Sequence, residues 1–266
     1  MIAKSLTILV FTSGLVSATT SIISYNSGVS PTAGTTGAAD PITQGWSFFG
    51  GNNNFASGLD STIGGWRITD GSSSATAFYQ QTLNTAQVND MTINDWVVTW
   101  TNTLNHDAVS TAGGGVDDYY NTSRQTNNQL WLSFASNGYL LTHGVDANGD
   151  FTLSDGTNIF TITTANNQMS EEIGSGSPLV KQYVTYTLSY DAGLNQATLT
   201  DNLGGSHGVI ANSGALAGGD RLIWGATTGA GQGSTTWNSL DLSVIPEPSA
   251  LTFGSLSLIL LLCRRR

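Results

Sequence analysis

The stretch that decides the fold is Tyr183-Val-Thr-Tyr-Thr-Leu-Ser-Tyr-Asp191, which is followed by a short turn and then by Gln196-Ala-Thr-Leu-Thr-Asp201. Apolar and aromatic residues occupy every second position from Val184 to Tyr190, with threonine and serine between them. Successive side chains of a strand point to opposite faces, so this alternation predicts a strand with one buried face. Two such segments around a turn predict a β-hairpin.

The same alternation recurs along the chain. Leu130, Leu132 and Phe134 share one face of a segment, and Leu240, Leu242 and Val244 share one face of the last strand. Further candidate strands are Ser21–Tyr25, Ala75–Leu83, Thr92–Thr101, Tyr139–Thr142, Phe151–Ser154, Ile159–Thr163, Val209–Asn212 and Arg221–Gly225. No segment has a convincing 3.6-residue apolar stripe, so no amphipathic helix is predicted. About a dozen short strands predict one all-β domain of two packed sheets over residues 46–244.

The pattern resembles the concanavalin A-like jelly roll, the fold of laminin-G and sialidase-associated lectin modules. The resemblance rests on the hairpin quoted above, on Ala77-Phe-Tyr-Gln-Gln81 as an early inner strand, and on the closing pair Arg221-Leu-Ile-Trp-Gly225 and Trp237 to Val244. It implies a jelly-roll sandwich and a lectin-like function.

The first eighteen residues have the three parts of a secretory signal peptide. Lys4 supplies the positive charge, Leu6 to Val16 form the apolar stretch, and small residues precede a cut between Ala18 and Thr19. Residues 19–45 are then a Gly/Ser/Thr-rich lead-in that begins with a short strand. The sequence therefore predicts an exported protein.

The other end of the chain carries Pro246-Glu247-Pro248, an apolar run from Ala250 to Cys263, and the terminal cluster Arg264, Arg265 and Arg266. The two prolines keep the motif out of a helix. The arginines would hold the end of the run in the cytoplasm by the positive-inside rule. Everything before the motif would therefore lie outside the inner membrane.

This order of motif, apolar helix and arginines closely resembles the PEP-CTERM sorting domain. The resemblance covers residues 245–266 and implies cleavage near the motif by an exosortase in a Gram-negative-type host that makes exopolysaccharide. Pro246, Glu247 and Pro248 match the recognition motif, and the three arginines match the retention cluster. The fourteen-residue apolar run would rise about 21 Å as a helix, short of the roughly 30 Å hydrocarbon core. A short span suits a transient anchor that is later cut, after which the protein would be at the cell surface, in the outer membrane or secreted.

The charge of the exported part excludes some partners. Its basic side chains are Arg67, Arg124, Lys181 and Arg221, against all eighteen carboxylates of the chain. So acidic a chain repels nucleic acid and anionic lipid surfaces, which excludes both as partners. Membrane contact is expected only through the C-terminal helix before processing. The one cysteine, Cys263, lies in the sorting tail, which excludes disulfides and thiol catalysis from the domain.

No catalytic arrangement is visible in the sequence. Hydrolases of the laminarinase type, which share the fold, need two carboxylates across the sugar. Glu171 and Glu172 are adjacent and would face opposite sides of a strand, and Glu247 belongs to the sorting motif. The sequence therefore predicts a protein that is not an enzyme, with no catalytic residues and no cofactor.

Metal binding is not predicted either. Asp146-Ala-Asn148-Gly-Asp150 has oxygen ligands but departs from the EF-hand pattern, and Asn148-Gly149 favours a tight hairpin turn. Whether Asp146, Asn148 and Asp150 bind a cation stays open. The histidines His106, His143 and His207 have no zinc-site spacing and are expected at the surface or at strand edges.

The function expected from the sequence is an exosortase-processed, non-catalytic protein that contacts polysaccharide. Its partners would be the export machinery, the exosortase and a glycan whose binding residues the sequence does not reveal. Most of the seven tryptophans are expected in the core, and Trp131 is singled out because it alternates against the apolar face of its strand. The alternatives are a structural or adhesive matrix component without a discrete ligand, and a cryptic glycan hydrolase or lyase.

Overall fold

The structure is a computed structural model, and it describes residues 19–30, 37–50, 55–59, 64–70, 76–105, 125–145, 151–162, 183–215, 217–226 and 233–246. The expected signal peptide, the cation-site candidate at 146–150, both central glutamates, His106 and the sorting tail beyond Pro246 lie outside these residues. None of the helices in the described ranges is long and apolar enough to cross a membrane.

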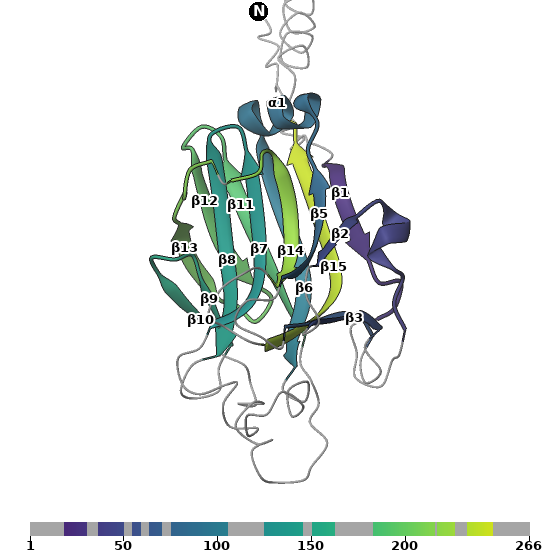
Figure 1. Ribbon diagram of the computed structural model, residues 1–266. Coiled ribbons are helices and arrows are strands. Elements are labelled where there is room, and N and C mark those ends of the chain that lie inside the picture. The colour runs from purple at the N-terminus through teal and green to yellow at the C-terminus, as the bar shows by residue number, and fades with distance from the viewer. Residues whose placement is uncertain are drawn as a thin grey trace, which may run out of the picture.

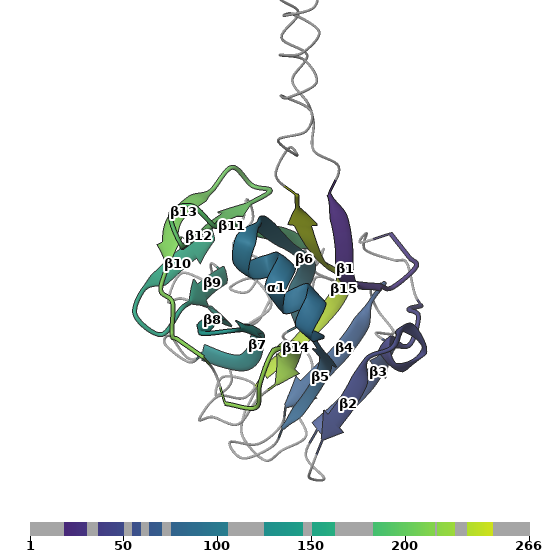
Figure 2. The same ribbon diagram turned by 90° about the horizontal axis from the view of Figure 1, so that it is seen from above.

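Two antiparallel sheets pack face to face (Figures 1 and 2), which confirms the predicted all-β sandwich. The eight-stranded sheet runs in the order β13 (Ser206–Ile210), β12 (Gln196–Asp201), β11 (Val184–Asp191), β6 (Asp95–Asn105), β15 (Gly233–Ile245), β4 (Trp66–Asp70) and β3 (Phe55–Leu59), with β1 (Thr20–Asn26) also paired to β15. The seven-stranded sheet runs in the order β10 (Ile159–Ile162), β9 (Phe151–Ser154), β8 (Asn137–Val145), β7 (Gln125–Phe134), β14 (Arg221–Ala226), β5 (Ala77–Thr82) and β2 (Ser47–Gly50).

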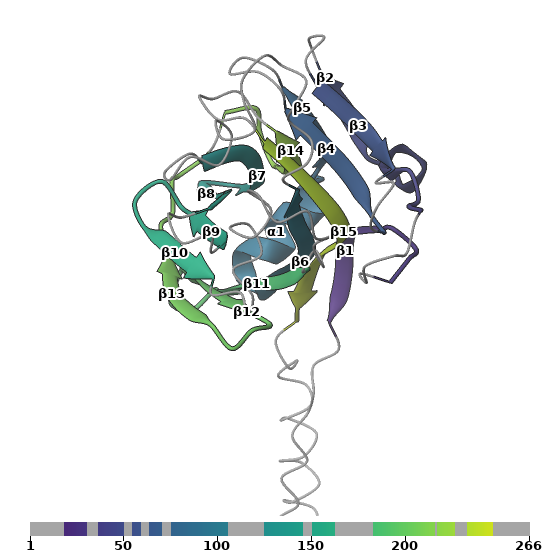
Figure 3. The same ribbon diagram turned by 90° about the horizontal axis from the view of Figure 1, so that it is seen from below.

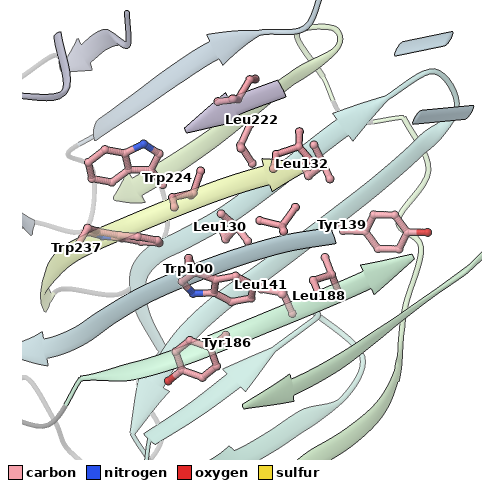
Figure 4. Packing of buried hydrophobic residues seen from close by; sticks show 14 of the residues in the cluster. Trp100, Leu130, Leu132, Tyr139, Leu141, Tyr186, Leu188, Leu222, Trp224 and Trp237 are labelled. Carbon is pink, nitrogen blue, oxygen red and sulfur yellow. The ribbon is translucent and has the colours of Figure 1, made fainter. Parts of the chain in front are cut away.

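The core lies between the sheets and follows the predicted alternation. On β11 the apolar and aromatic positions are buried, whereas the threonines and the serine between them are partly or fully exposed. Leu130 and Leu132 of β7 face Leu188 of β11 across the same core (Figure 4). The two sheets therefore bury the faces that the sequence pattern predicts.

Aromatic pairs join neighbouring strands within this core. Trp96 and Trp100 of β6 lie directly opposite Tyr190 and Tyr186 of β11 in the strand register. The ring centroids are 4.9 Å apart in the first pair and 5.1 Å in the second, and both pairs are stacked. Such cross-strand pairs add to the free energy gained by burial, and they fix the register of the two strands.

The described residues contain a short 3-10 helix, η1 (Pro41–Gln44), and one α-helix, α1 (Thr85–Ile93). The sequence pattern did not predict α1, which lies across one end of the sandwich (Figures 1 and 2). A capping box starts it, because the Asn84 side chain accepts from the backbone N–H of Gln87 and the Gln87 side chain accepts from the backbone N–H of Asn84. Met91 is its fully buried residue and closes the core at this end. We call this end of the sandwich the α1 end.

The first and last described strands meet at the α1 end. β1 runs antiparallel to β15, with Thr20 opposite Val244. Ile245, the last residue of β15, lies opposite Asp95, the first residue of β6 after α1. Figure 3 shows β1 and β15 side by side. The residues next to the two expected processing sites, Thr19 and Pro246, therefore flank neighbouring strands.

Candidate functional site

Five of the seven tryptophans are buried in the core, as expected: Trp46, Trp96, Trp100, Trp224 and Trp237. Trp66 and Trp131 are half-buried. Trp66 is held at the edge of the sandwich, where its Nε1–H lies 2.9 Å from Ser57 Oγ and 2.9 Å from Tyr79 Oη. Trp131 is therefore the tryptophan that faces outward from the middle of a sheet.

Trp131 belongs to a row of side chains that crosses the outer face of the seven-stranded sheet. Its neighbours Leu130 and Leu132 point into the core, so the indole points away from it. In the strand register Trp131 lies between Leu140 and Ile223, and Gln80 lies on the far side of Ile223. This row places an aromatic side chain and an amide on the outer face of the seven-stranded sheet.

Arg221 extends across this row. Its guanidinium carbon lies 5.4 Å from the centre of the Trp131 ring, a cation–π contact. Its Nη1 donates to Gln80 Oε1 at 2.9 Å, and its Nη2 donates to the Ala217 carbonyl at 2.7 Å. Ile223, between Trp131 and Gln80, is only 1% exposed although it faces outward. The guanidinium thus joins the two ends of the row above Ile223.

Two N–H donors at this stack remain unused. Trp131 Nε1 and Arg221 Nε are both buried, and neither has a hydrogen-bond partner in the part of the chain that the structure describes. A buried donor without an acceptor costs about 1–3 kcal/mol. The stack therefore contains two N–H donors whose hydrogen-bonding capacity is not used by the described residues.

The adjacent row adds an amide and an aromatic pair. Gln129 donates from Nε2 to Thr142 Oγ1 at 2.9 Å. Two strands further on, Phe78 stacks on Phe49 with ring centroids 5.0 Å apart, and Phe49 is 55% exposed. We define Trp131, Arg221, Gln80, Gln129 and Phe78 as the Trp131 surface.

A second polar group lies inside the sandwich around His143 of β8, which is 1% exposed. The expectation that the histidines lie at the surface or at edges is therefore wrong for His143. Its Nδ1 lies 2.9 Å from the Asn128 carbonyl, so it carries the proton, and Nε2 accepts from Trp100 Nε1 at 3.3 Å and from Asn102 Nδ2 at 2.8 Å. Burial lowers the pKa of His143 from 6.5 to about 4, although its bond to the Asn128 carbonyl opposes this shift. The imidazole is neutral at physiological pH.

His207 of β13 forms a hydrogen bond with Asp201 of β12, at the hairpin that joins these two strands. The distance from His207 Nε2 to Asp201 Oδ2 is 2.6 Å. Burial alone would raise the pKa of Asp201, but hydrogen bonds from His207 and from the backbone N–H groups of Gly205 and Leu203 hold it below its usual value. These bonds close the turn that links the two strands. Among the described side chains, no three His, Cys, Asp or Glu groups gather as metal ligands would.

Comparisons with known proteins support the fold. The chain is similar to the solved structure of a carbohydrate esterase from a Shiga toxin-encoding bacteriophage, at 15% identity and a TM-score of 0.50 over 86% of this chain and all of that one. It also matches the Trypanosoma rangeli sialidase (9% identity, TM-score 0.43, 82% of this chain) and a botulinum neurotoxin binding domain solved with SialylT (8%, 0.40, 75%). The chain spans 29% and 43% of those two structures. No family model matches the chain, and no curated protein does.

The comparison with the phage protein corrects one prediction. The sequence predicted a protein that is not an enzyme, because the glutamate pair of glycoside hydrolases is missing. A sandwich of this fold is described as a carbohydrate esterase, which overturns that prediction. Ester cleavage can use a hydroxyl nucleophile with an adjacent base, so a missing glutamate pair excludes one reaction and not catalysis in general. At 15% identity the likeness itself shows the fold alone.

Proposed function

We propose that this chain is an exported carbohydrate-binding protein and that the saccharide lies on the Trp131 surface. The observation that carries the proposal is the outward stack of Trp131 and Arg221, with two unused N–H donors. The amides of Gln80 and Gln129 flank this stack in the same and the adjacent row.

The chemistry of a sugar matches this arrangement. A pyranose ring has apolar C–H faces that pack on aromatic rings, and its edge carries hydroxyl groups that both donate and accept hydrogen bonds. Aromatic, amide and guanidinium groups together provide the apolar contact and the few polar groups that fix orientation. The fold shared with a carbohydrate esterase is compatible with a saccharide ligand.

Removing the indole tests this site. Trp131→Ala is expected to weaken saccharide binding at least tenfold, which corresponds to about 1.4 kcal/mol. Binding is measured on an array of neutral, amino and acidic oligosaccharides, and then by calorimetry with the best ligand. Trp131→Phe should recover part of the affinity. Trp66→Ala changes a tryptophan of the other sheet, and it should bind saccharide as tightly as wild type, provided that the variant unfolds cooperatively. If Trp131→Ala binds as tightly as wild type, the saccharide does not lie on the Trp131 surface. If the wild-type protein binds no glycan on the array, the proposed site also fails, and this result favours a matrix component without a discrete ligand.

Export and exosortase processing are the second part of the proposal. They rest on the signal-like residues before Thr19 and on Pro246-Glu247-Pro248 followed by an apolar run and three arginines. The pairing of β1 with β15 supports this, because both expected processing sites then adjoin the α1 end.

The mass of the protein recovered from its own host tests this second part. The wild-type product is expected to begin at Thr19 and to end near Pro248. In a Pro246→Ala/Glu247→Ala variant the C-terminal cut should be lost while the N-terminal cut remains. A wild-type product that still ends at Arg266 would show that the tail is a plain anchor, and the exosortase proposal would then fail.

A further inference from the structure

Among the described residues of this acidic protein, Arg221 has no carboxylate partner. The whole chain has eighteen carboxylates and eight Lys and Arg residues. Arg221 instead donates to an amide oxygen of Gln80 and to the carbonyl of Ala217, both neutral. Within the described ranges it makes no ion pair.

We propose that Arg221 binds the carboxylate of an acidic sugar, such as a uronic or a nonulosonic acid, whose ring packs beside it on the Trp131 surface. This inference rests on the proposed carbohydrate-binding function and names the ligand class of that same site.

The hydrogen-bonding capacity of the guanidinium supports this ligand. Arginine has five N–H donors in a planar fork that matches a carboxylate, and Arg221 uses one for Gln80 and one for Ala217. Its Nε is left without an acceptor, as is Trp131 Nε1 beside it. A carboxylate would supply both a negative charge and two acceptor oxygens, whereas a hydroxyl group would supply one acceptor oxygen and no charge.

The position of Arg221 also supports recognition at this site. The cation–π contact with Trp131 and the bond to Gln80 hold the guanidinium above the row, on the outer face of the sheet. The carboxylate of neighbouring Asp220 points elsewhere, because its Oδ1 accepts from the backbone N–H of Ala135 at 2.7 Å. Carboxylates farther away are screened, since the Debye length is about 8 Å at physiological ionic strength. Among the described residues, the charged group that faces a sugar on the Trp131 surface is therefore the Arg221 guanidinium.

Arg221 also braces the turn before β14 through the Ala217 carbonyl. A purely structural role would make every Arg221 variant less stable but would give the protein no preference between acidic and neutral sugars. The decisive measurement therefore compares ligands on the wild-type protein first, and variants second.

The ligands are three polysaccharides that contain uronic acids, namely polygalacturonate, alginate and hyaluronan, and the monosaccharide N-acetylneuraminate. Each is paired with its carboxyl-reduced form. The wild-type protein is expected to bind at least one acidic member about tenfold or more tightly than its neutral counterpart. Arg221→Gln should bring the two affinities together because it weakens binding of the acidic form much more than binding of the neutral form, and Arg221→Lys should keep part of the preference. Arg67→Gln, which removes a half-buried arginine from the other sheet, should leave the preference intact.

The outcomes separate this inference from the proposed function. If the wild-type protein prefers no acidic member of any pair but still binds neutral glycans through Trp131, the inference about Arg221 is overturned and the carbohydrate-binding surface stands. If it binds no saccharide at all, the proposed function itself fails. Equal affinity for polyglutamate would show simple ion pairing without sugar recognition and would also overturn the inference.

Discussion

Replacing Trp224 with alanine is expected to lower the free energy of unfolding by about 4 kcal/mol. Trp224 is fully buried on β14 and lies at the centre of an aromatic cluster. Its ring centroid is 4.8 Å from that of Tyr79, 5.0 Å from Tyr25, 5.2 Å from Trp237 and 5.7 Å from Trp46. The substitution removes four ring contacts and leaves a cavity between strands of both sheets, so the loss exceeds that of burial alone.

Urea unfolding followed by circular dichroism measures this loss, and Trp131→Ala is the matched control. Trp131 lies on the outer face and is half-buried, so its removal should cost only about 1 kcal/mol. Equal losses in the two variants would contradict the placement of Trp224 in the core and of Trp131 on the surface.

The free energy of unfolding is expected to fall by about 2 kcal/mol between pH 7 and pH 5 because of His143. The pKa of this side chain is about 4 in the folded protein, against 6.5 in the unfolded chain. Between these two values the unfolded chain binds a proton that the folded protein does not, so stability falls as the pH falls through this window. Protonation of Nε2 would place a hydrogen against two donors, Trp100 Nε1 and Asn102 Nδ2, which explains why the folded state resists it.

Urea unfolding at several pH values tests this for the wild-type protein and for His143→Gln, in which most of the fall should disappear. The measurements stay above pH 5, because the lowered pKa values of Asp155 and Asp201 add further losses of unfolding free energy at lower pH. His207→Gln should keep the fall, since it leaves His143 in place. An NMR titration in which the His143 ring is already protonated at pH 6 would contradict the prediction directly.

The strands that the sequence predicts best are those with strict alternation. β9 is found with the predicted bounds, Phe151–Ser154, and β11 covers Val184–Asp191 where the alternation predicts a strand from Tyr183 to Tyr190. Both strands bury side chains in the core, so their apolar composition and their two-residue period predict the same strand. β2, β3 and β4 have glycine, serine and mixed polarity at their positions, and the pattern gave no bounds for them.

The helix α1 was missed for a related reason. Met91 is its one fully buried residue, so there is no apolar stripe to detect. The capping residues Asn84 and Gln87 were the available signal, because an Asn followed three residues later by Gln marks a helix start. Its last residues, Thr92 and Ile93, were instead assigned to the strand that follows.

The candidate site was only partly predictable. Trp131 stood out because it is an aromatic residue on the side of its strand opposite the apolar face of Leu130 and Leu132. Arg221 and Gln80 could not be connected to it, because they lie about 90 and 50 residues away and meet it only through the register of β7, β14 and β5. Sequence shows which side of a strand a residue faces, whereas neighbours across a sheet depend on pairing that a single sequence does not specify.

The pairing of β1 with β15 also determines how the domain would respond to mechanical tension. Because the two strands are antiparallel and Thr20 lies opposite Val244 at the α1 end, a force applied to both termini pulls the strands apart at that end first. The interstrand hydrogen bonds would then be loaded one after another and not all together, and such a pair opens at low force. A chain held at one terminus alone carries no such load across this pair. Cutting either terminal segment would therefore remove this load from the pair of β1 and β15.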